Sequence, residues 1–235
     1  MVDFHSHILP NMDDGYKDVK DSVSVLTDMK KSGVEAVALT SHYYMEDETI
    51  DEFLLRRNNS FDTLTAMIRE LNADVPKLIL GAEVKYRFGI SKLEGIEKLC
   101  YENTSYLLIE LPFSKWDKTI FDELQNLSIR NGVNPIIAHF DRYISFGNSI
   151  GAFDTYGHPI QINAEVFQKP FGKKRWLKFI KERYSVVLGS DTHNLISRKP
   201  NLNIALDYIA EKAGSRYIRK IEDVENLLLN NIKNN

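Results

Sequence analysis

The chain has 235 residues, of which 43% are hydrophobic and 27% are charged, and its formal net charge at pH 7 is −3. This composition is typical of a globular protein with one sizeable core, and its acidic balance provides no basic surface for nucleic acid. No apolar run approaches the roughly 20 residues of a membrane-spanning helix, the start does not resemble a signal peptide, and we therefore expect a cytoplasmic protein without membrane insertion.

Short β-branched or apolar runs alternate along the chain with segments of helical periodicity, a pattern typical of βα units and a parallel sheet. We expect strands at 1–4, 36–40, 77–81, 106–109, 135–138, 160–162 and 185–189. We expect helices at 18–32, 50–71, 118–131, near Ile150, and at 173–182, 202–212 and 221–232. No repeat or linker interrupts this alternation, so the sequence predicts one α/β domain over residues 1–235, a distorted (β/α)7 barrel similar to a TIM barrel.

Side chains that can bind metal ions follow most of the predicted strands at the point where each strand ends. His5 and His7 lie one residue apart and therefore project to the same side of an extended chain. In a barrel, the carboxyl ends of the strands share one face, where the reactive residues gather. Each residue alone could be a cap or a loop residue, but the whole set predicts a metal site. Its members are His5, His7, His42, Glu83, Glu110, His139, Asp191 and His193.

The residue types at these strand ends limit the chemistry. Imidazole and carboxylate ligands without thiolate suit Mn, Fe or Zn. Cys100 is the only cysteine, and the sixth residue after it is Tyr106 rather than the arginine of a thiol-dependent phosphatase. Any hydrolysis must therefore use a nucleophile other than sulfur. The remaining histidine, His158, lies before a predicted strand, and we expect it to be a turn residue.

One motif resembles a known family. His-Ser-His-Ile-Leu-Pro-x-Met-Asp-Asp-Gly at 5–15 is similar to the opening motif of PHP-domain (polymerase and histidinol phosphatase) proteins. It most resembles the bacterial manganese-dependent protein-tyrosine phosphatases of capsule and exopolysaccharide operons. Further similar motifs follow in the same order at 40–42, 81–83, 108–110, 137–143 and 190–194.

The resemblance implies a PHP-superfamily barrel that holds three divalent metal ions, with Mn²⁺ expected and Fe or Zn as alternatives. By position, His5, His7, Glu83 and Asp191 would bind the first ion, and Glu83, Glu110 and His139 the second. Asp14, His42 and His193 would bind the third, while Arg142 and Arg198 would bind the phosphate. This chain has Phe140 and Asp141 where relatives differ, and its acidic 43–57 segment has no clear counterpart.

The expected activity is hydrolysis of phosphotyrosine by a metal-activated hydroxide, without a covalent intermediate. A tyrosyl leaving group with a pKa of about 10 needs little proton assistance, so Asp141 is only a candidate general acid. The implied substrate is a phosphotyrosine protein, a membrane-associated tyrosine autokinase that controls polysaccharide synthesis. The alternatives are a phosphoesterase for a small phosphomonoester such as histidinol phosphate, an amidohydrolase-like enzyme and a non-catalytic scaffold.

Overall fold

The computed structural model describes residues 1–148, 157–182 and 185–230, and within them every strand pair is parallel. The strands are β1 (Val2–Asp3), β2 (Ala36–Leu39), β3 (His42–Tyr43), β4 (Lys77–Leu80), β5 (Glu83–Lys85), β6 (Tyr106–Glu110), β7 (Asn134–Ile137), β8 (Ile160–Asn163) and β9 (Val186–Gly189). The α-helices are α1 (Val19–Lys31), α2 (Ile50–Glu70), α3 (Lys118–Asn131), α5 (Lys173–Glu182), α6 (Leu202–Ala213) and α7 (Ser215–Asn230). The 3₁₀ helices are η1 (Ile90–Lys92), η2 (Ile96–Leu99), η3 (Phe140–Phe146) and η4 (Ala164–Phe167).

The strands form a ring. The hydrogen-bonded orders are β1-β2-β4 and β3-β5-β6-β7-β8-β9, and β3 and β5 continue β2 and β4 after two-residue interruptions. The first and last strands meet where the Phe4 N–H donates to the Leu188 carbonyl at 3.1 Å and the Asp191 N–H donates to the His5 carbonyl at 2.7 Å. The predicted seven-stranded barrel is therefore confirmed, with two of its strands each divided into two short pieces.

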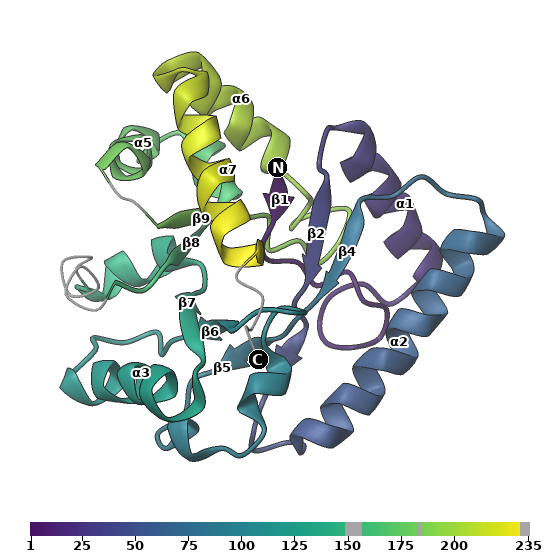
Figure 1. Ribbon diagram of the computed structural model, residues 1–235. Coiled ribbons are helices and arrows are strands. Elements are labelled where there is room, and N and C mark those ends of the chain that lie inside the picture. The colour runs from purple at the N-terminus through teal and green to yellow at the C-terminus, as the bar shows by residue number, and fades with distance from the viewer. Residues whose placement is uncertain (149–156, 183–184, 231–235) are drawn as a thin grey trace.

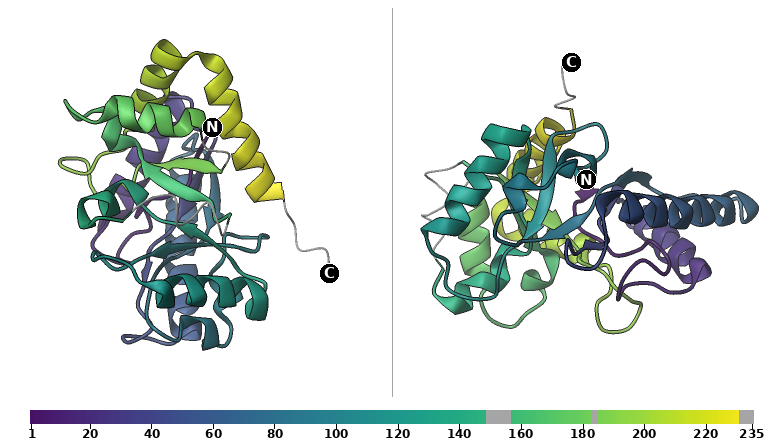
Figure 2. Two further views of the ribbon diagram at one scale, coloured as in Figure 1. Left: turned by 90° about the vertical axis from the view of Figure 1, so that its left-hand side faces the viewer. Right: turned by 90° about the horizontal axis from the view of Figure 1, so that it is seen from below.

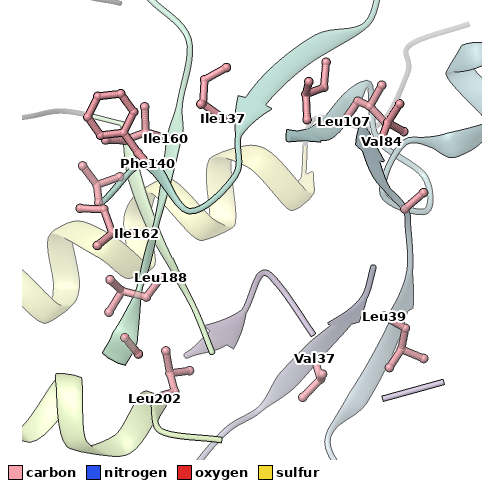
Figure 3. Close-up of a cluster of buried hydrophobic side chains, with 14 of the residues drawn as sticks. Val37, Leu39, Val84, Leu107, Ile137, Phe140, Ile160, Ile162, Leu188 and Leu202 are labelled. Atoms are coloured by element: carbon pink, nitrogen blue, oxygen red, sulfur yellow. The ribbon is translucent and has the colours of Figure 1, made fainter. Parts of the chain in front are cut away.

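Side chains point alternately to the two faces of each strand, and they form two apolar clusters, one inside the barrel and one beneath the helices. In β2, Val37 and Leu39 point outward into the layer beneath the helices, whereas Ala36 and Ala38 point into the barrel. Figure 3 shows part of the outer layer, in which Leu188 of β9 lies near Leu202 of α6. The inner cluster includes Phe4 and Tyr101 as well as smaller apolar residues, and the polar candidate ligands lie at the carboxyl ends of the strands.

Local sequence signals explain where the helices begin. The Asp18 side chain accepts a hydrogen bond from the Lys20 N–H at the start of α1, and Thr49 and Glu52 form a capping box at the start of α2. These two helices pack against each other beside β2 and β4 (Figure 1). α3 covers the β5–β6–β7 side, and α5 and α6 cover the β8–β9 side (Figures 1 and 2).

The last helix, α7, lies across the barrel at the amino ends of the strands (Figure 1). Its Val224 and Leu228 side chains join the inner apolar cluster, and the Glu225 carboxylate accepts a hydrogen bond of 3.0 Å from the Val2 N–H. α7 begins at Ser215 rather than at the predicted residue 221, because Gly214, with φ of 95°, already ends α6. The predicted residues 231–232 and the predicted helical stretch near Ile150 lie outside the described residues.

None of the helices in the described ranges is long and apolar enough to cross a membrane.

Candidate metal centre

The segments that follow β1, β4 and β9 bring four candidate ligands together at the floor of a cleft. His5 Nε2 lies 3.0 Å from His7 Nε2 and 3.1 Å from Glu83 Oε2. Asp191 Oδ1 lies 3.6 Å from His5 Nε2 and 3.5 Å from His7 Nε2. All four residues are almost fully buried. The structure thus places the first predicted set around one point.

Glu83 connects this group to the other candidate ligands. Its Oε1 lies 3.0 Å from His139 Nε2, which lies 3.5 Å from Glu110 Oε1. Its Oε2 lies 3.0 Å from His42 Nδ1. A carboxylate with only 1% of its surface exposed is therefore surrounded by imidazoles from several strands, a position suited to a ligand that bridges two cations.

The third predicted set lies on the solvent side of His7. Asp14 Oδ1 is 3.3 Å from His193 Nε2 and 3.5 Å from His42 Nε2, and the Asp14 side chain is 65% exposed. Ligand atoms of these three residues and of His7 all lie within 4.8 Å of one another. All nine predicted ligands therefore converge on one end of the barrel.

Hydrogen bonds to Nδ1 orient three of the imidazoles. His5 Nδ1 donates to Gln161 Oε1 at 3.1 Å, His7 Nδ1 donates to Asp13 Oδ2 at 2.7 Å, and His193 Nδ1 donates to the Asp191 carbonyl at 2.9 Å. Nε2 of each ring faces the centre, and it would present its lone pair to a cation once any proton on it is lost. This is the tautomer that a metal ligand needs, fixed by a second group as in known metal sites.

The imidazoles and carboxylates at the centre shift one another's pKa values. Burial would lower the pKa of His7, but the Asp13 and Glu83 carboxylates outweigh burial and raise that pKa to about 10. Burial would likewise raise the pKa of Glu83, but His5, His139 and His42 hold it well below its usual range. In the protein without bound cations, protons on imidazole therefore balance the buried carboxylates.

Arg142 and Arg198 both contact Asp191 at the edge of the floor. Arg142 pairs with Asp191 Oδ2, and Arg198 Nη2 lies 2.7 Å from Asp191 Oδ1. Burial would raise the pKa of Asp191, but His5 and Arg142 outweigh it and keep that pKa well below its usual range. Both guanidinium groups remain about one-third exposed and border the cleft beside the candidate ligands.

The cleft has a volume of about 440 Å³, and aromatic and cationic side chains form its mouth. Phe113, which is 46% exposed, stacks on the His139 ring with centroids 5.7 Å apart and planes at 17°. Elsewhere in the lining, Lys85 Nζ lies 5.0 Å from the centre of the Tyr44 ring. The floor is therefore rich in imidazole and carboxylate, and the walls are aromatic.

The backbone is strained at two of these strand ends. His139 has a φ of 29° and Asp191 a φ of 52°, and such conformations cost about 1–3 kcal/mol for residues other than glycine. At the end of β9, a Cβ on Gly189 would lie 2.6 Å from the His5 Cβ and 2.7 Å from Gln161 Nε2. Close packing around the ligands thus requires glycine at this position.

Comparison with known proteins identifies the family. Residues 1–228 match the family model described as "Capsular polysaccharide synthesis, CpsB/CapC". The chain belongs to the CpsB/CapC family. The resemblance found in the motifs is thereby confirmed.

Members of the CpsB/CapC family and related structures match along almost the whole chain. The tyrosine-protein phosphatase CpsB of Streptococcus pneumoniae is 30% identical and is matched over 94% of both chains. The tyrosine-protein phosphatase YwqE of Bacillus subtilis strain 168 is 26% identical over 98% of this chain and 92% of its own. A chain from the crystal structures of YwqE and CpsB, described as "unique metal-dependent tyrosine phosphatases", superposes with a TM-score of 0.82 at 22% identity, covering 98% of this chain and 95% of the other.

The donor set of this CpsB/CapC chain fits divalent cations. His193 Nε2 and His42 Nδ1 are buried and are not assigned a hydrogen bond in the described part of the chain. His193 Nε2 is held toward Asp14, and His42 Nδ1 toward Glu83. Buried polar atoms normally have partners, so these ring nitrogens are suited to a ligand that the protein itself does not supply.

Three functional residues of the CpsB/CapC chain were missed by the sequence analysis. Asp13 anchors His7, Gln161 Oε1 accepts from both His5 Nδ1 and the His139 N–H, and Asn163 Nδ2 donates to Asp191 Oδ2 at 3.1 Å. Gln161 and Asn163 alternate with isoleucine in β8. Two polar residues on the inner face of an otherwise apolar strand were the signal that could have identified them.

Proposed function

We propose that this CpsB/CapC chain is a metal-dependent phosphatase that hydrolyses phosphotyrosine in proteins. The observation that carries the proposal is the convergence of nine imidazole and carboxylate side chains beneath two arginines in an aromatic cleft. The names of the relatives from Streptococcus pneumoniae and Bacillus subtilis, both tyrosine-protein phosphatases, support the same activity.

The contacts support the ligand sets that the resemblance implies for three divalent ions. His5, His7, Glu83 and Asp191 would hold the first ion, and Glu83, Glu110 and His139 the second. Asp14, His42 and His193 would hold the third, with His7 close by. A mixed imidazole and carboxylate set suits Mn, Fe or Zn, and we propose Mn²⁺ because the motifs resemble those of manganese-dependent phosphatases.

Bound divalent ions would supply a water-derived nucleophile near neutral pH and neutralise phosphate oxygens. Arg142 and Arg198 would then bind the remaining phosphate oxygens, because a guanidinium group can make paired hydrogen bonds to phosphate. Their contacts with Asp191 hold both groups at the edge of the floor before substrate binds.

Asp141 is better suited to positioning than to proton donation. Its Oδ1 accepts a hydrogen bond of 2.9 Å from the Asn163 N–H, which fixes the end of β8 beside Asp191. A tyrosyl leaving group, with a pKa of about 10, requires little protonation as it departs.

The walls of the cleft favour an aromatic phosphoester over a small aliphatic one. Phe113 and Tyr44 present ring surface above the candidate ligands, and aromatic pairs contribute about 0.5–1.5 kcal/mol beyond the area that they bury. This surface would contact the ring of phosphotyrosine, whereas histidinol phosphate has only an imidazole at the end of an aliphatic chain.

We also propose that the physiological substrate is a membrane-associated tyrosine autokinase of polysaccharide synthesis, dephosphorylated at the cytoplasmic face of the membrane. The support is the description of the family, capsular polysaccharide synthesis.

The test compares turnover of a phosphotyrosine peptide and of histidinol phosphate by the Mn²⁺-loaded enzyme, with metal content measured by elemental analysis. We expect close to three ions per chain and a clear preference for the peptide. His139→Ala removes a candidate ligand and should lose most activity together with bound metal. His158→Ala removes the histidine that lies outside the site and serves as the matched control. Activity that survives chelation in the wild type, or in His139→Ala, would refute the proposal.

A further inference from the structure

A second hollow, which we name the acidic groove, lies beside the cleft. It has a volume of about 860 Å³ and is formed by the start of α2, the segment before it and the segment that leads from η1 into η2. Tyr43 lines the groove, and the next residue, Tyr44, lines the cleft. Glu46 lines the groove, and its Oε1 accepts a hydrogen bond of 2.7 Å from Nε of Arg87, which lines the cleft. A peptide bound in the cleft would therefore have neighbouring residues at the acidic groove.

The lining of the acidic groove contains seven carboxylates and, among the residues that the structure describes, one cation, Lys98. Four of these carboxylates have partners within the protein. Three form ion pairs, and one closes the capping box at the start of α2, where it offsets the partial positive charge of that helix end. The pairs are Glu46–Arg87, Glu48–Arg56 and Asp51–Lys98, and the capping residue is Glu52.

The other three carboxylates of the groove, those of Asp47, Glu94 and Glu97, make no ion pair within the described ranges. Asp47 comes from the segment before α2, and Glu94 and Glu97 come from the segment between η1 and η2. Like charges that line one hollow repel one another, and a cation placed among them relieves this repulsion. The charge of the acidic groove is therefore suited to a cationic group, whereas the two arginines of the cleft are suited to a phosphate.

Tyr43 provides an independent indication of a ligand. Its side chain is only 1% exposed, and its ring packs on Phe53 with centroids 5.3 Å apart and planes at 71°. Its hydroxyl group makes no hydrogen bond with any residue that the structure describes, although Tyr43 lines the groove. Burial, together with Glu48 and Glu46, raises the pKa of Tyr43, so the phenol stays protonated near those carboxylates. Buried polar atoms normally have partners, and a hydroxyl oxygen can accept a hydrogen bond from an ammonium or guanidinium group.

We propose that the acidic groove binds a lysine or arginine side chain of the protein substrate, at a position that flanks the phosphotyrosine in the cleft. The inference rests on the proposed function and extends it, because it gives the enzyme a preference for sequence around the phosphotyrosine. Met45 and Leu93 are half-buried in the lining and would contact the aliphatic stem of the basic side chain. A substrate with a phosphate and a nearby cation then matches the charge of both hollows, which favours it over other phosphoproteins.

The experiment uses the full-length Mn²⁺-loaded enzyme and three phosphotyrosine peptides that differ only in Lys, Gln or Glu at the flanking positions. The kcat/KM of wild type should be highest for the Lys peptide and lowest for the Glu peptide. The Lys peptide should exceed the Gln peptide by about fivefold, mainly through KM, which is the scale of one exposed ion pair. This preference should decrease at high salt, because exposed charges are screened.

Two variants change the acidic groove. Glu94→Lys reverses an exposed charge in its lining, and Tyr43→Phe removes only the hydroxyl group and keeps the ring that packs on Phe53. Asp207→Lys is the matched control for Glu94→Lys, because it makes the same change of charge at an exposed position of α6, outside the groove. The ratio of kcat/KM values for the Lys and Gln peptides is measured within each variant, so that partial loss of metal or folded protein cancels.

Loss of the Lys preference in Glu94→Lys but not in Asp207→Lys, with a decrease of about twofold in Tyr43→Phe, supports the acidic groove as the subsite. A Lys preference that is unchanged in Glu94→Lys, or that is lost equally in Asp207→Lys, would overturn the inference. If wild type hydrolyses all three peptides equally, the groove is not a subsite, while the proposed function stands. If wild type hydrolyses none of them, the proposed function fails, and this inference fails with it.

Discussion

At the residue scale, the candidate centre depends on side chains that need not touch a cation. Asp13 accepts hydrogen bonds from His7 Nδ1 at 2.7 Å and from the His42 N–H at 2.8 Å. Asp13 therefore fixes the ring of His7 and the backbone of His42, two of the candidate ligands. Burial would raise the pKa of Asp13, but His7 holds it well below its usual range, so this carboxylate stays charged.

Asp13→Asn should weaken metal binding without removing a ligand. The amide keeps the size of the side chain but loses the charge that orients His7, and loss of such a partner typically costs about 10- to 100-fold in metal affinity or activity. Titration of the metal-free protein with Mn²⁺ measures the effect. Asp21→Asn, an exposed change in α1, is the control, and equal affinity in the two variants would contradict the role of Asp13.

The sequence predicted the candidate ligands better than the residues that orient them. Glu83 and His139 follow apolar strands directly, and the barrel rule places such positions on one face. The role of Asp13 or Gln161 depends on which partner lies across the barrel, and no local pattern specifies that. In the pair Asp13–Asp14, the structure separates a buried anchor from an exposed candidate ligand, a distinction that side-by-side carboxylates in a sequence do not make.

At the scale of elements, the end of β9 must approach β1 and β8 closely. Gly189→Ala should therefore destabilise the protein, by about 1–3 kcal/mol as for other overpacked sites, and should lower metal content because the added methyl group displaces His5 or Gln161. Chemical denaturation of the metal-free protein gives the first quantity, and elemental analysis gives the second.

Gly81→Ala is a suitable comparison, because its added Cβ would lie no closer than 3.1 Å to any atom, the nearest being in the Tyr101 ring. A smaller loss of stability and an unchanged metal content are expected there. Equal effects of the two substitutions would show that the close approach at β9 has no special importance.

The helix that covers the amino ends of the strands contains a buried acid. Burial raises the pKa of Glu225 to about 8, and its side chain accepts from the Val2 N–H. The folded state binds a proton on Glu225 more tightly than the unfolded state does. Protonation of Glu225 therefore stabilises the folded state, and this contribution is fully present below about pH 4.5. It is lost as the pH rises toward 8.

Glu225→Gln removes this titration. The free energy of unfolding of the variant, relative to wild type, should therefore increase from pH 5 to pH 9, by roughly 4 kcal/mol for a pKa raised from 4.5 to about 8 at 1.36 kcal/mol per pKa unit. Urea denaturation of both proteins at each pH measures the difference. A constant difference between the two proteins across this range would show that Glu225 does not titrate there.

The ends of helices and strands could be predicted where the sequence contains a local signal, such as a capping residue or a glycine, and not elsewhere. α3 begins after the Asp117 cap and ends before Gly132, as the sequence indicated. The short strands β3 and β5 have only two and three residues and no apolar run of their own, because they exist through pairing with neighbours. α7 began earlier than expected because Gly214 already ends α6, and Tyr217 and Ile218 then pack against the outer apolar cluster.

At the scale of the whole molecule, bound cations would connect distant parts of the chain. A ligand that binds only the folded state adds about 2.7 kcal/mol at 100 times its Kd. For a chain of this size, this should raise the Tm by about 5–10 °C at about 2–4 °C per kcal/mol. Thermal denaturation with added Mn²⁺ and after chelation measures the shift, and His139→Ala should show a smaller one. An identical Tm in both conditions would mean that no cation links these elements.

The candidate ligands span nearly the whole length of the chain, from His5 beside β1 to His193 after β9, and the two ends meet at the Phe4–Leu188 hydrogen bond. During synthesis on the ribosome, the growing chain therefore has only part of the candidate ligand set until β9 has emerged and paired with β1. A complete set of ligands would then form only after β9 has joined the ring, and the ion bound would depend on the exchangeable cations present at that time.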